Sequence, residues 1–250
     1  MKDFSFQGKI YLGERLAGGK PGKLIWVGDA PKCDVSLSTE SETRKESYSG
    51  NRVTSARLQK GNEAEIAMTL NWITGSNLAL GLYGSVVDTA AGSVTGELLP
   101  DDLVAGDVFM LDHGTVSALV LTDSAGAPVT VNPSHYELES APGGIGKLLN
   151  ASTYVQPLKA AYSHGASTDV AMFTQRPPER YLVLDGINTL DNTRVRVRLY
   201  RCQFDPSSQL PMINESFGTM ELSGAVLFDS DQGNDDELGN FGKIELQEAA

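Results

Sequence analysis

Apolar and polar residues alternate along several short segments of the chain, and this period of two is typical of β-strands. Glycine, with 26 occurrences, separates these segments at short intervals. The pattern predicts strands over residues 23–28, 32–38, 51–59, 63–73, 107–112, 115–122, 180–185, 193–204 and 219–228. We therefore expect an all-β fold, mainly antiparallel.

One predicted strand, residues 63–72, separates apolar from polar side chains almost without exception. One face carries Ala64, Ile66, Met68, Leu70 and Trp72, and the other carries Glu63, Glu65, Ala67, Thr69 and Asn71. The first face is expected to pack on a core, which leaves an acidic or small and polar face on the outside of the sheet.

A second strand, within residues 193–204, repeats this design with the opposite charge. Arg194, Arg196 and Arg198 alternate with Val195, Val197 and Leu199. The arginines either meet water or pair with carboxylates, and the carboxylates can lie on a neighbouring strand or on another subunit.

Helix signals are few. Residues 76–83 form the best candidate, because Ser76 or Asn77 can cap it, Leu78 and Leu82 share a face, and Gly84 can end it. Residues 92–150 are denser in Gly, Pro and Asp than their surroundings and read as an elaboration inserted into a single domain that spans residues 1–250.

The composition limits the possible functions. A formal charge of −12 disfavours general binding of nucleic acid, because such binding needs cations against phosphates. The N-terminal residues lack the apolar run of a signal peptide, and no stretch is long enough to span a bilayer, so a soluble protein without membrane partners is expected. Cys33 and Cys202 are too few and too far apart for a disulfide framework or a paired metal site.

No catalytic, cofactor or metal site emerges from the motifs. Residues 17–23 and 141–147 resemble a phosphate-binding loop but lack its first glycine and its final hydroxyl residue, so turns are expected there. His113, His135 and His164 stand in isolated turns. Residues 229–237 depart from a calcium loop at three key positions and read as a solvated acidic loop. We expect no enzyme.

Two segments nevertheless resemble a known family. Residues 179–229, which contain the arginine strand, and residues 31–84, with a polar loop between two strands followed by a short helix, are similar to the major tail tube protein of long-tailed bacteriophages. The resemblance implies a β-sandwich or barrel-like subunit with one flanking helix, and a tail that is non-contractile. Six subunits would join their inner sheets into a ring, and rings would stack into a hollow tube.

The resemblance also implies the partners. These are other copies of the chain, a tape-measure protein, the tail terminator and tail tip proteins, and genomic DNA that passes through without specific binding. The protein would assemble in the host cytoplasm and reside in the virion. A ring of six would carry a formal charge of −72, six times −12.

Three groups of residues have expected places in such a tube. A bore that lets DNA slide should be acidic or small and polar, which places Glu63, Glu65, Thr69 and Asn71 at the lumen. The arginines Arg194, Arg196 and Arg198 should meet carboxylates of a neighbouring subunit or strand. The polar segment 32–50 should be a mobile loop that orders on reaching the adjacent ring, with contacts from Glu40, Glu42, Arg44, Lys45, Glu46 and Tyr48. The segments 1–11 and 241–250 are the second choice for contacts between rings.

Two other function classes remain open. A carbohydrate-binding or adhesive β-sandwich would use exposed aromatic residues such as Tyr48, Tyr136 and Tyr162. A hydrolase would need two convergent carboxylates, which the sequence does not single out among its 32 acidic residues.

Overall fold

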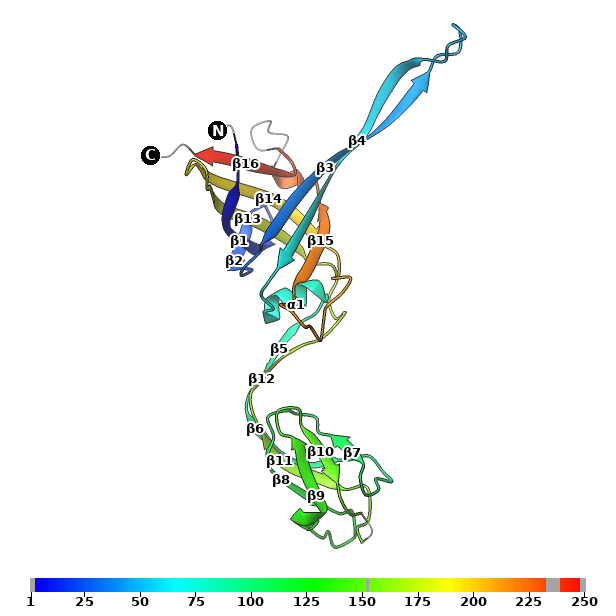
Figure 1. The fold of residues 1–250 in the computed structure, drawn as a ribbon, viewed down its shortest axis with the longest axis vertical. Coiled ribbons are helices and arrows are strands. Elements are labelled where there is room, and N and C mark those ends of the chain that lie inside the picture. The colour runs from blue at the N-terminus through cyan, green and yellow to red at the C-terminus, as the bar shows by residue number, and fades with distance from the viewer. Residues whose placement is uncertain (1–2, 152, 233–238, 248–250) are drawn as a thin grey trace. The chain divides into compact units, whose positions relative to one another are not determined.

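The computed structural model of the chain describes residues 3–151, 153–232 and 239–247 (Figure 1). Strands dominate it, and they pair antiparallel, so the expected all-β fold is confirmed. The chain divides into two compact units. Unit 1 comprises Met1–Val86 and Val170–Ala250, and unit 2 comprises Val87–Asp169.

Unit 1 is built on one eight-stranded sheet in the order β2-β1-β13-β14-β15-β4-β3, with β16 paired to β14 as well. Strand β14 pairs with β16 through Arg194–Leu199 and with β15 through Cys202–Phe204, so the sheet divides along this strand. The strands are β1 (Phe6–Arg15), β2 (Pro21–Trp26), β3 (Lys32–Lys45), β4 (Thr54–Leu70), β13 (Glu179–Asn188), β14 (Arg194–Phe204), β15 (Met220–Val226) and β16 (Gly242–Gln247).

Both halves of this sheet contribute to one hydrophobic core. Leu12 of β1, Leu182 of β13 and Val195 of β14 come from one half, and Ile66 of β4 and Leu222 of β15 come from the other. The alternation predicted for residues 63–72 is confirmed up to the end of the strand, since Ala64, Ile66, Met68 and Leu70 are buried.

Trp72 departs from this pattern. The strand ends at Leu70, and the Trp72 side chain is half exposed and meets Trp26 edge-on at 5.0 Å between ring centroids. It lies against Gly28, where an added Cβ would come within 2.7 Å of the indole ring. The turn after the strand therefore redirects Trp72 away from the core.

The expected helix is present as α1 (Gly75–Gly81), but its cap differs from the prediction. Thr74 is the N-cap and accepts a hydrogen bond from the Asn77 amide at 3.2 Å. Asn77 is buried, and its side-chain amide donates to the carbonyl oxygens of Val27 and Trp72. These bonds hold α1 against the end of the sheet.

Unit 2 contains two three-stranded sheets around a core of its own. The chain enters and leaves it through β5 and β12, which pair with each other. Its strands and short helix are β5 (Val86–Thr89), β6 (Gly92–Leu98), β7 (Val108–Met110), β8 (Ser117–Thr122), η1 (Pro133–His135), β9 (Tyr136–Ser140), β10 (Ile145–Leu148), β11 (Lys159–His164) and β12 (Ser167–Val170).

This organisation corrects the expected elaboration at 92–150 within a single domain. The unit runs from Val87 to Asp169 because β11, beyond the expected end, pairs with both β6 and β8. Without β11 neither half of the second sheet could form. The inserted segment is therefore a compact unit, not a loop with short strands.

The prediction of a mobile loop at residues 32–50 is also wrong. It is not a loop, because β3 continues to Lys45 and pairs with β4 along its whole length. The expected terminal arms are mostly parts of the sheet as well, since Phe6–Glu14 pairs with β13 and Gly242–Gln247 pairs with β14. Residues 1–2 and 248–250 of these segments lie outside the described residues.

Candidate assembly surfaces

The β3–β4 hairpin extends well beyond the sheet that carries it (Figure 1). Strand β4 pairs with β15 only from Ala64 to Leu70. The outer part, residues 38–63, pairs only within the hairpin, from Ser38 opposite Glu63 to Lys45 opposite Thr54. Its side chains are exposed except for that of Glu46. A hairpin of this kind lacks a hydrophobic face to hold it, and two strands alone are only marginally stable in water.

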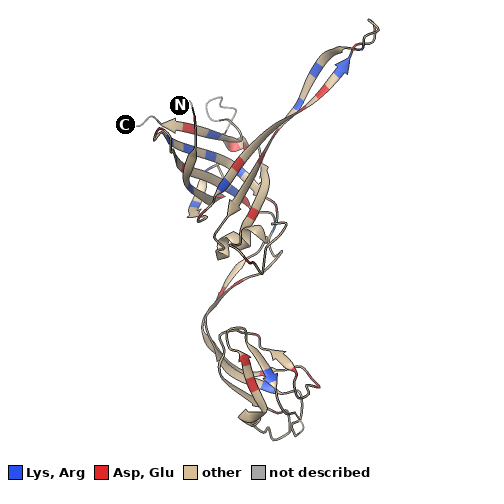
Figure 2. Cartoon of the chain, in the orientation of Figure 1, with Lys and Arg blue, Asp and Glu red and all other residues tan. Residues whose placement is uncertain are grey.

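The hairpin tip, residues 43–57, is basic within an acidic protein (Figure 2). It carries Arg44, Lys45, Arg52 and Arg57 against a single carboxylate, a formal charge of +3, so the rest of the chain carries −15. All four cations are exposed, and none forms an ion pair with a described residue. Below the tip, Lys60 pairs with Glu42 at 2.9 Å and lies 3.9 Å from Glu40.

Glu46, the one carboxylate of the tip, is used inside the turn. Its carboxylate accepts hydrogen bonds from the amides of Tyr48 and Ser49, at 2.8 and 2.9 Å, and from the Ser49 hydroxyl. These bonds, with the hydroxyl of Ser49 first, lower the pKa of Glu46 to about 2. Gly50, with a φ of 82°, lets the chain turn back beside it. The tip therefore presents cations and Tyr48, which is 89% exposed, on an ordered turn.

The outer face of β3, β4 and β15 is small and polar, with an excess of carboxylates. Glu63, Glu65, Ala67 and Thr69 share this face, as expected from the sequence, and Asn71 follows the strand end and donates to Asp29 at 2.6 Å. Register places Asp34 and Ser36 beside them on β3. On the other side, Glu221, Ser223 and Ala225 of β15 lie opposite Thr69, Ala67 and Glu65. We call this surface the small-polar face.

Two arginines of β14 pair with a carboxylate of the same chain. Arg198 and Arg196 both pair with Glu245 of β16, Arg196 at 3.5 Å. This is the neighbouring-strand alternative, while a place for Arg196 and Arg198 at a subunit interface stays a prediction. Arg194 is exposed, lies opposite Gln247 and makes no ion pair with a described residue.

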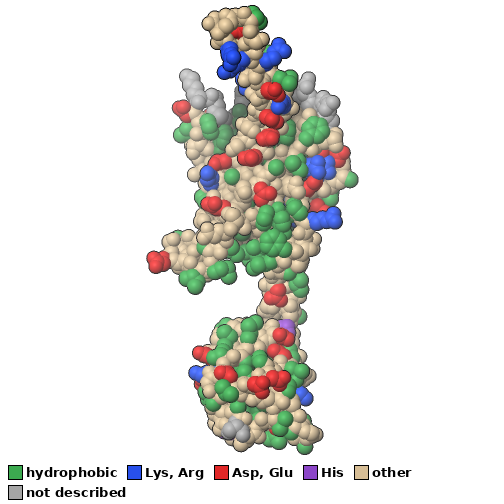
Figure 3. All heavy atoms as spheres, turned by 90° about the vertical axis from the view of Figure 1, so that its right-hand side faces the viewer, with side chains coloured by type: hydrophobic (Ala, Val, Ile, Leu, Met, Phe, Trp, Pro, Cys, Tyr) green, Lys and Arg blue, Asp and Glu red, His purple; other side chains and the backbone are tan. Residues whose placement is uncertain are grey.

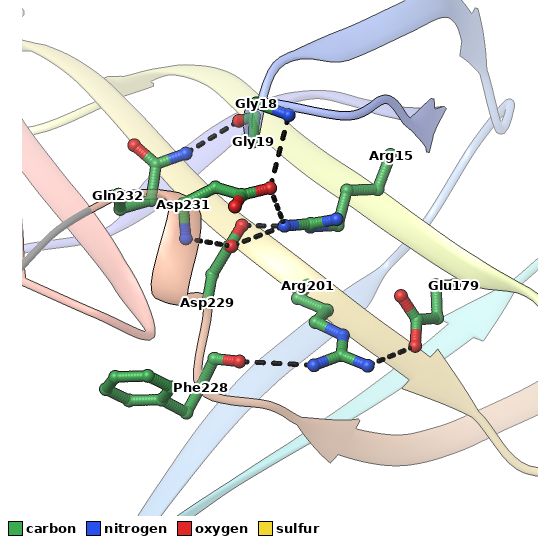
Figure 4. A network of polar contacts seen from close by, with 9 residues as sticks. All are labelled: Arg15, Gly18, Gly19, Glu179, Arg201, Phe228, Asp229, Asp231 and Gln232. Carbon is green, nitrogen blue, oxygen red and sulfur yellow. Dashed lines mark hydrogen bonds and ion pairs between the residues drawn. The ribbon is translucent and has the colours of Figure 1, made fainter.

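A second charged network joins the β1–β2 turn to the segment after β15 (Figure 4). Arg15 donates to both carboxylate oxygens of Asp229, at 3.0 and 2.6 Å, and to Asp231 at 2.6 Å. Asp229 is fully buried, and the guanidinium lowers the pKa of its carboxyl. Beside it, Arg201 pairs with Glu179 at 2.6 Å. Asp229 and Asp231, with η2 (Ser230–Gln232), are thus tied to an arginine, while residues 233–237 of the expected acidic loop lie outside the described residues.

The segments with phosphate-loop or metal-ligand residue types form turns and ring contacts in the described part of the chain. Residues 17–23 and 141–147 form turns that lead into strands β2 and β10, not into helices. His113 and His164 stack in parallel at 4.0 Å, and His135 contacts the Tyr154 hydroxyl. Within the described ranges, no group of three or more His, Cys, Asp or Glu side chains is placed to hold a metal ion.

The two cysteines are free thiols on the core side of the sheet. Cys33 is partly buried and Cys202 is buried. Burial raises the pKa of Cys33 to about 11 and also raises that of Cys202. Both thiols are therefore protonated at neutral pH and packed as small apolar groups.

The aromatic residues considered for carbohydrate binding are not gathered on one surface. Tyr136 and Tyr162 are buried in unit 2, with their hydroxyls bonded to the carbonyl of Leu119 and to Glu97. Only Tyr48 of the three is exposed. None of the helices in the described part of the chain is long and apolar enough to cross a membrane.

Comparison with known proteins places almost the whole chain in one family. The model of the family described as "Protein of unknown function UCP028589" matches residues 3–245. The chain belongs to this family. No curated protein matches the chain.

Proposed function

We propose that this chain is a structural subunit of a bacteriophage tail tube, in which six copies close into a ring and rings stack into a hollow tube. The observation that carries the proposal is the outer part of the β3–β4 hairpin. It holds 26 residues, from Ser38 to Glu63, and pairs with no other strand among the described residues. Stacking on another copy would bury it.

The edges of the sheet support assembly as well. Strands β2, β3 and β16 each pair on one side only within the described residues. Free edges of this length invite pairing with another chain, and closure into a ring removes them. The ring would be completed by edge strands of neighbouring copies.

The small-polar face supplies a surface suited to a DNA channel. It presents Asp34, Glu63, Glu65 and Glu221, with Lys32 as its one cation, and the Lys32 ammonium lies 3.1 Å from Asp34. Repulsion from phosphates would keep passing DNA from binding. The basic hairpin tip would then point away from the bore and contact an acidic surface of the next ring. A non-contractile tail, a tape-measure protein, tail terminator and tip proteins, and location in the virion belong to the same proposal.

Negative-stain electron microscopy of two forms of the protein tests this function. The wild-type chain should form rings and tubes. A variant in which residues 42–58 are replaced by an Asn-Gly turn removes the tip from the hairpin without touching the core. It should keep the melting temperature of the wild type and form rings that do not stack.

A wild-type protein that remains a single particle at every concentration and salt tested would overturn the proposal. Tubes formed equally well by the shortened variant would remove the hairpin from the stacking contact. Specific retention of the single particles on glycan columns would favour the carbohydrate-binding alternative.

A further inference from the structure

The loop between β14 and β15, residues 205–219, exposes large apolar side chains. Met212, Ile213 and Phe217 have exposed fractions of 81%, 95% and 102%. Single exposed apolar residues are common, but three within six residues of one loop indicate a contact surface. Figure 3 shows apolar side chains gathered at the end of unit 1 that carries α1.

The base of this loop is held in place while its apolar side chains point outward. The amide of Ser207 donates to the carbonyl of Gly81 in α1 at 2.7 Å, and Leu210 packs against the core. Within the loop, the Asn214 side chain donates to the carbonyl of Pro211 at 3.5 Å. The contact with α1 therefore fixes the base of the loop, while its apolar side chains stay exposed.

An apolar groove of about 280 Å³ lies elsewhere on the same unit, between β3 and β16. It exists because β15 and β16 pair with different ends of β14, which leaves a gap between them. Leu37 and Ile244 at the groove are 78% and 64% exposed. The other apolar residues that line it are Val35, Ala64, Val197, Leu199, Val226 and Phe241.

We propose that the 205–219 loop of one copy inserts Met212, Ile213 and Phe217 into this groove of a second copy. The inference rests on the proposed function, since it names a contact through which copies associate. Charge favours this occupant: Glu215 is the one charged residue among residues 209–218, and Lys243 is the one charged residue that lines the groove.

The contact joins two different surfaces, so it is heterologous and repeats from copy to copy. In Figure 1, α1 and β16 lie at opposite ends of unit 1, so the repeat runs head to tail. Net charge makes such a contact necessary, because chains of −12 repel one another and local apolar burial has to overcome this repulsion.

Cysteine cross-linking tests the contact directly. Leu37→Cys and Ile213→Cys are introduced separately and together in a Cys33→Ser background, since Cys33 lies on β3 near the groove, while the buried Cys202 is retained. On mild oxidation, a mixture of the two single variants should give disulfide dimers. The chain with both cysteines should give a ladder of larger oligomers, and neither single variant should form dimers with itself.

A matched pair of surface variants measures how much the contact contributes. Ile213→Ser with Phe217→Ser should raise the protein concentration needed for assembly roughly tenfold or more, with an unchanged melting temperature, because both side chains are exposed in the single chain. Leu190→Ser is the control, since Leu190 is 62% exposed in the turn between β13 and β14, away from the 205–219 loop in the sequence and absent from the groove lining. It should assemble as the wild type does.

The outcomes separate this inference from the proposed function. Wild-type tubes without the mixed disulfide, or tubes unaffected by the double serine variant, would overturn the loop-and-groove contact and leave the tube function standing. The mixed disulfide in open chains that never form rings would support the contact and overturn the tube function. If neither the mixed disulfide nor any assembly is observed, both the loop-and-groove contact and the tube function are overturned.

Discussion

Glu46 orders the hairpin tip through a carboxylate that stays ionised. Because hydrogen bonds from Ser49 and Tyr48 lower its pKa from 4.5 to about 2, the folded tip favours the charged form. This contribution to the order of the turn is fully present above pH 4.5 and is lost as the pH falls toward 2. The turn that presents the four cations should therefore loosen in acid.

Glu46→Gln should reproduce this loosening at neutral pH. We expect the amides of Tyr48 and Ser49 to exchange with solvent about tenfold faster, with no change in the melting temperature, because the tip does not pack on the core. Hydrogen exchange followed by mass spectrometry measures the exchange of these two amides. Glu63→Gln is the matched control, since Glu63 accepts only a 3.4 Å hydrogen bond from Ser38. Equal exchange rates in the two variants would contradict the role of Glu46.

At the scale of elements, Asp229 joins the β1–β2 turn to the segment that follows β15. Its carboxylate is fully buried and accepts two hydrogen bonds from Arg15, while Asp231 is 40% exposed. Asp229→Asn should lower the free energy of unfolding of unit 1 by about 2–4 kcal/mol, because it leaves a largely buried guanidinium with only the partly exposed Asp231 as a charge partner. Asp231→Asn should cost less than about 1 kcal/mol.

Urea unfolding followed by tryptophan fluorescence measures the difference between the Asp229→Asn and Asp231→Asn variants in unit 1. Trp26 and Trp72, the two tryptophans, both lie in unit 1. The lowered pKa of Asp229 adds a second observable: its contribution is present above the ordinary value of 3.8 and is lost as the pH falls below it. Equal losses in the free energy of unfolding for the two variants would show that burial of Asp229 does not strengthen its ion pair with Arg15.

The sequence predicts the elements whose alternation is regular and misses those whose partners lie far away in the chain. The strands predicted at 63–73 and 193–204 are confirmed over most of their length because each carries buried apolar side chains at alternate positions. Strand β4 ends at Leu70, and the buried positions of β14 shift by one residue after Leu199. The strand predicted at 51–59 falls mostly within β4. Residues 39–45 and 60–62 are not predicted as strand because they lack an apolar face, yet they pair in the hairpin and so satisfy their backbone groups. Strand β1 is not predicted because its first half is exposed, and Ile10 and Leu12 are its only buried apolar residues.

The candidate surfaces follow the same division. The polar face of β4 could be predicted from alternation alone, since register within a strand fixes it. The pairing of Arg196 and Arg198 with Glu245 depends on β16, some 50 residues later in the sequence, and on its register with β14. The groove depends on where two strands end along β14, and no local pattern records that. The charge excess of residues 43–57 is present in the sequence, but the pairing of β3 with β4 is what shows that these residues form one tip.

At the scale of the whole molecule, net charge and local contacts would oppose each other in the assembly that we propose. A ring of six would carry −72, and this diffuse repulsion acts over about 30 Å at 0.01 M salt but only about 8 Å at 0.15 M. Apolar contacts are not weakened over this range. Tube formation should therefore become faster and occur at lower protein concentration as salt rises, which light scattering and sedimentation measure.

A variant with a neutralised tip tests the part that charge plays in the proposed assembly. Arg44→Gln, Arg52→Gln and Arg57→Gln together change the formal charge from −12 to −15 without touching the core or the apolar groove. This variant should need more salt than the wild type to reach the same rate, because it has both stronger repulsion and fewer cations for an acidic neighbour. Wild-type tubes that dissolve as salt rises would instead mean that contacts between opposite charges hold the rings together.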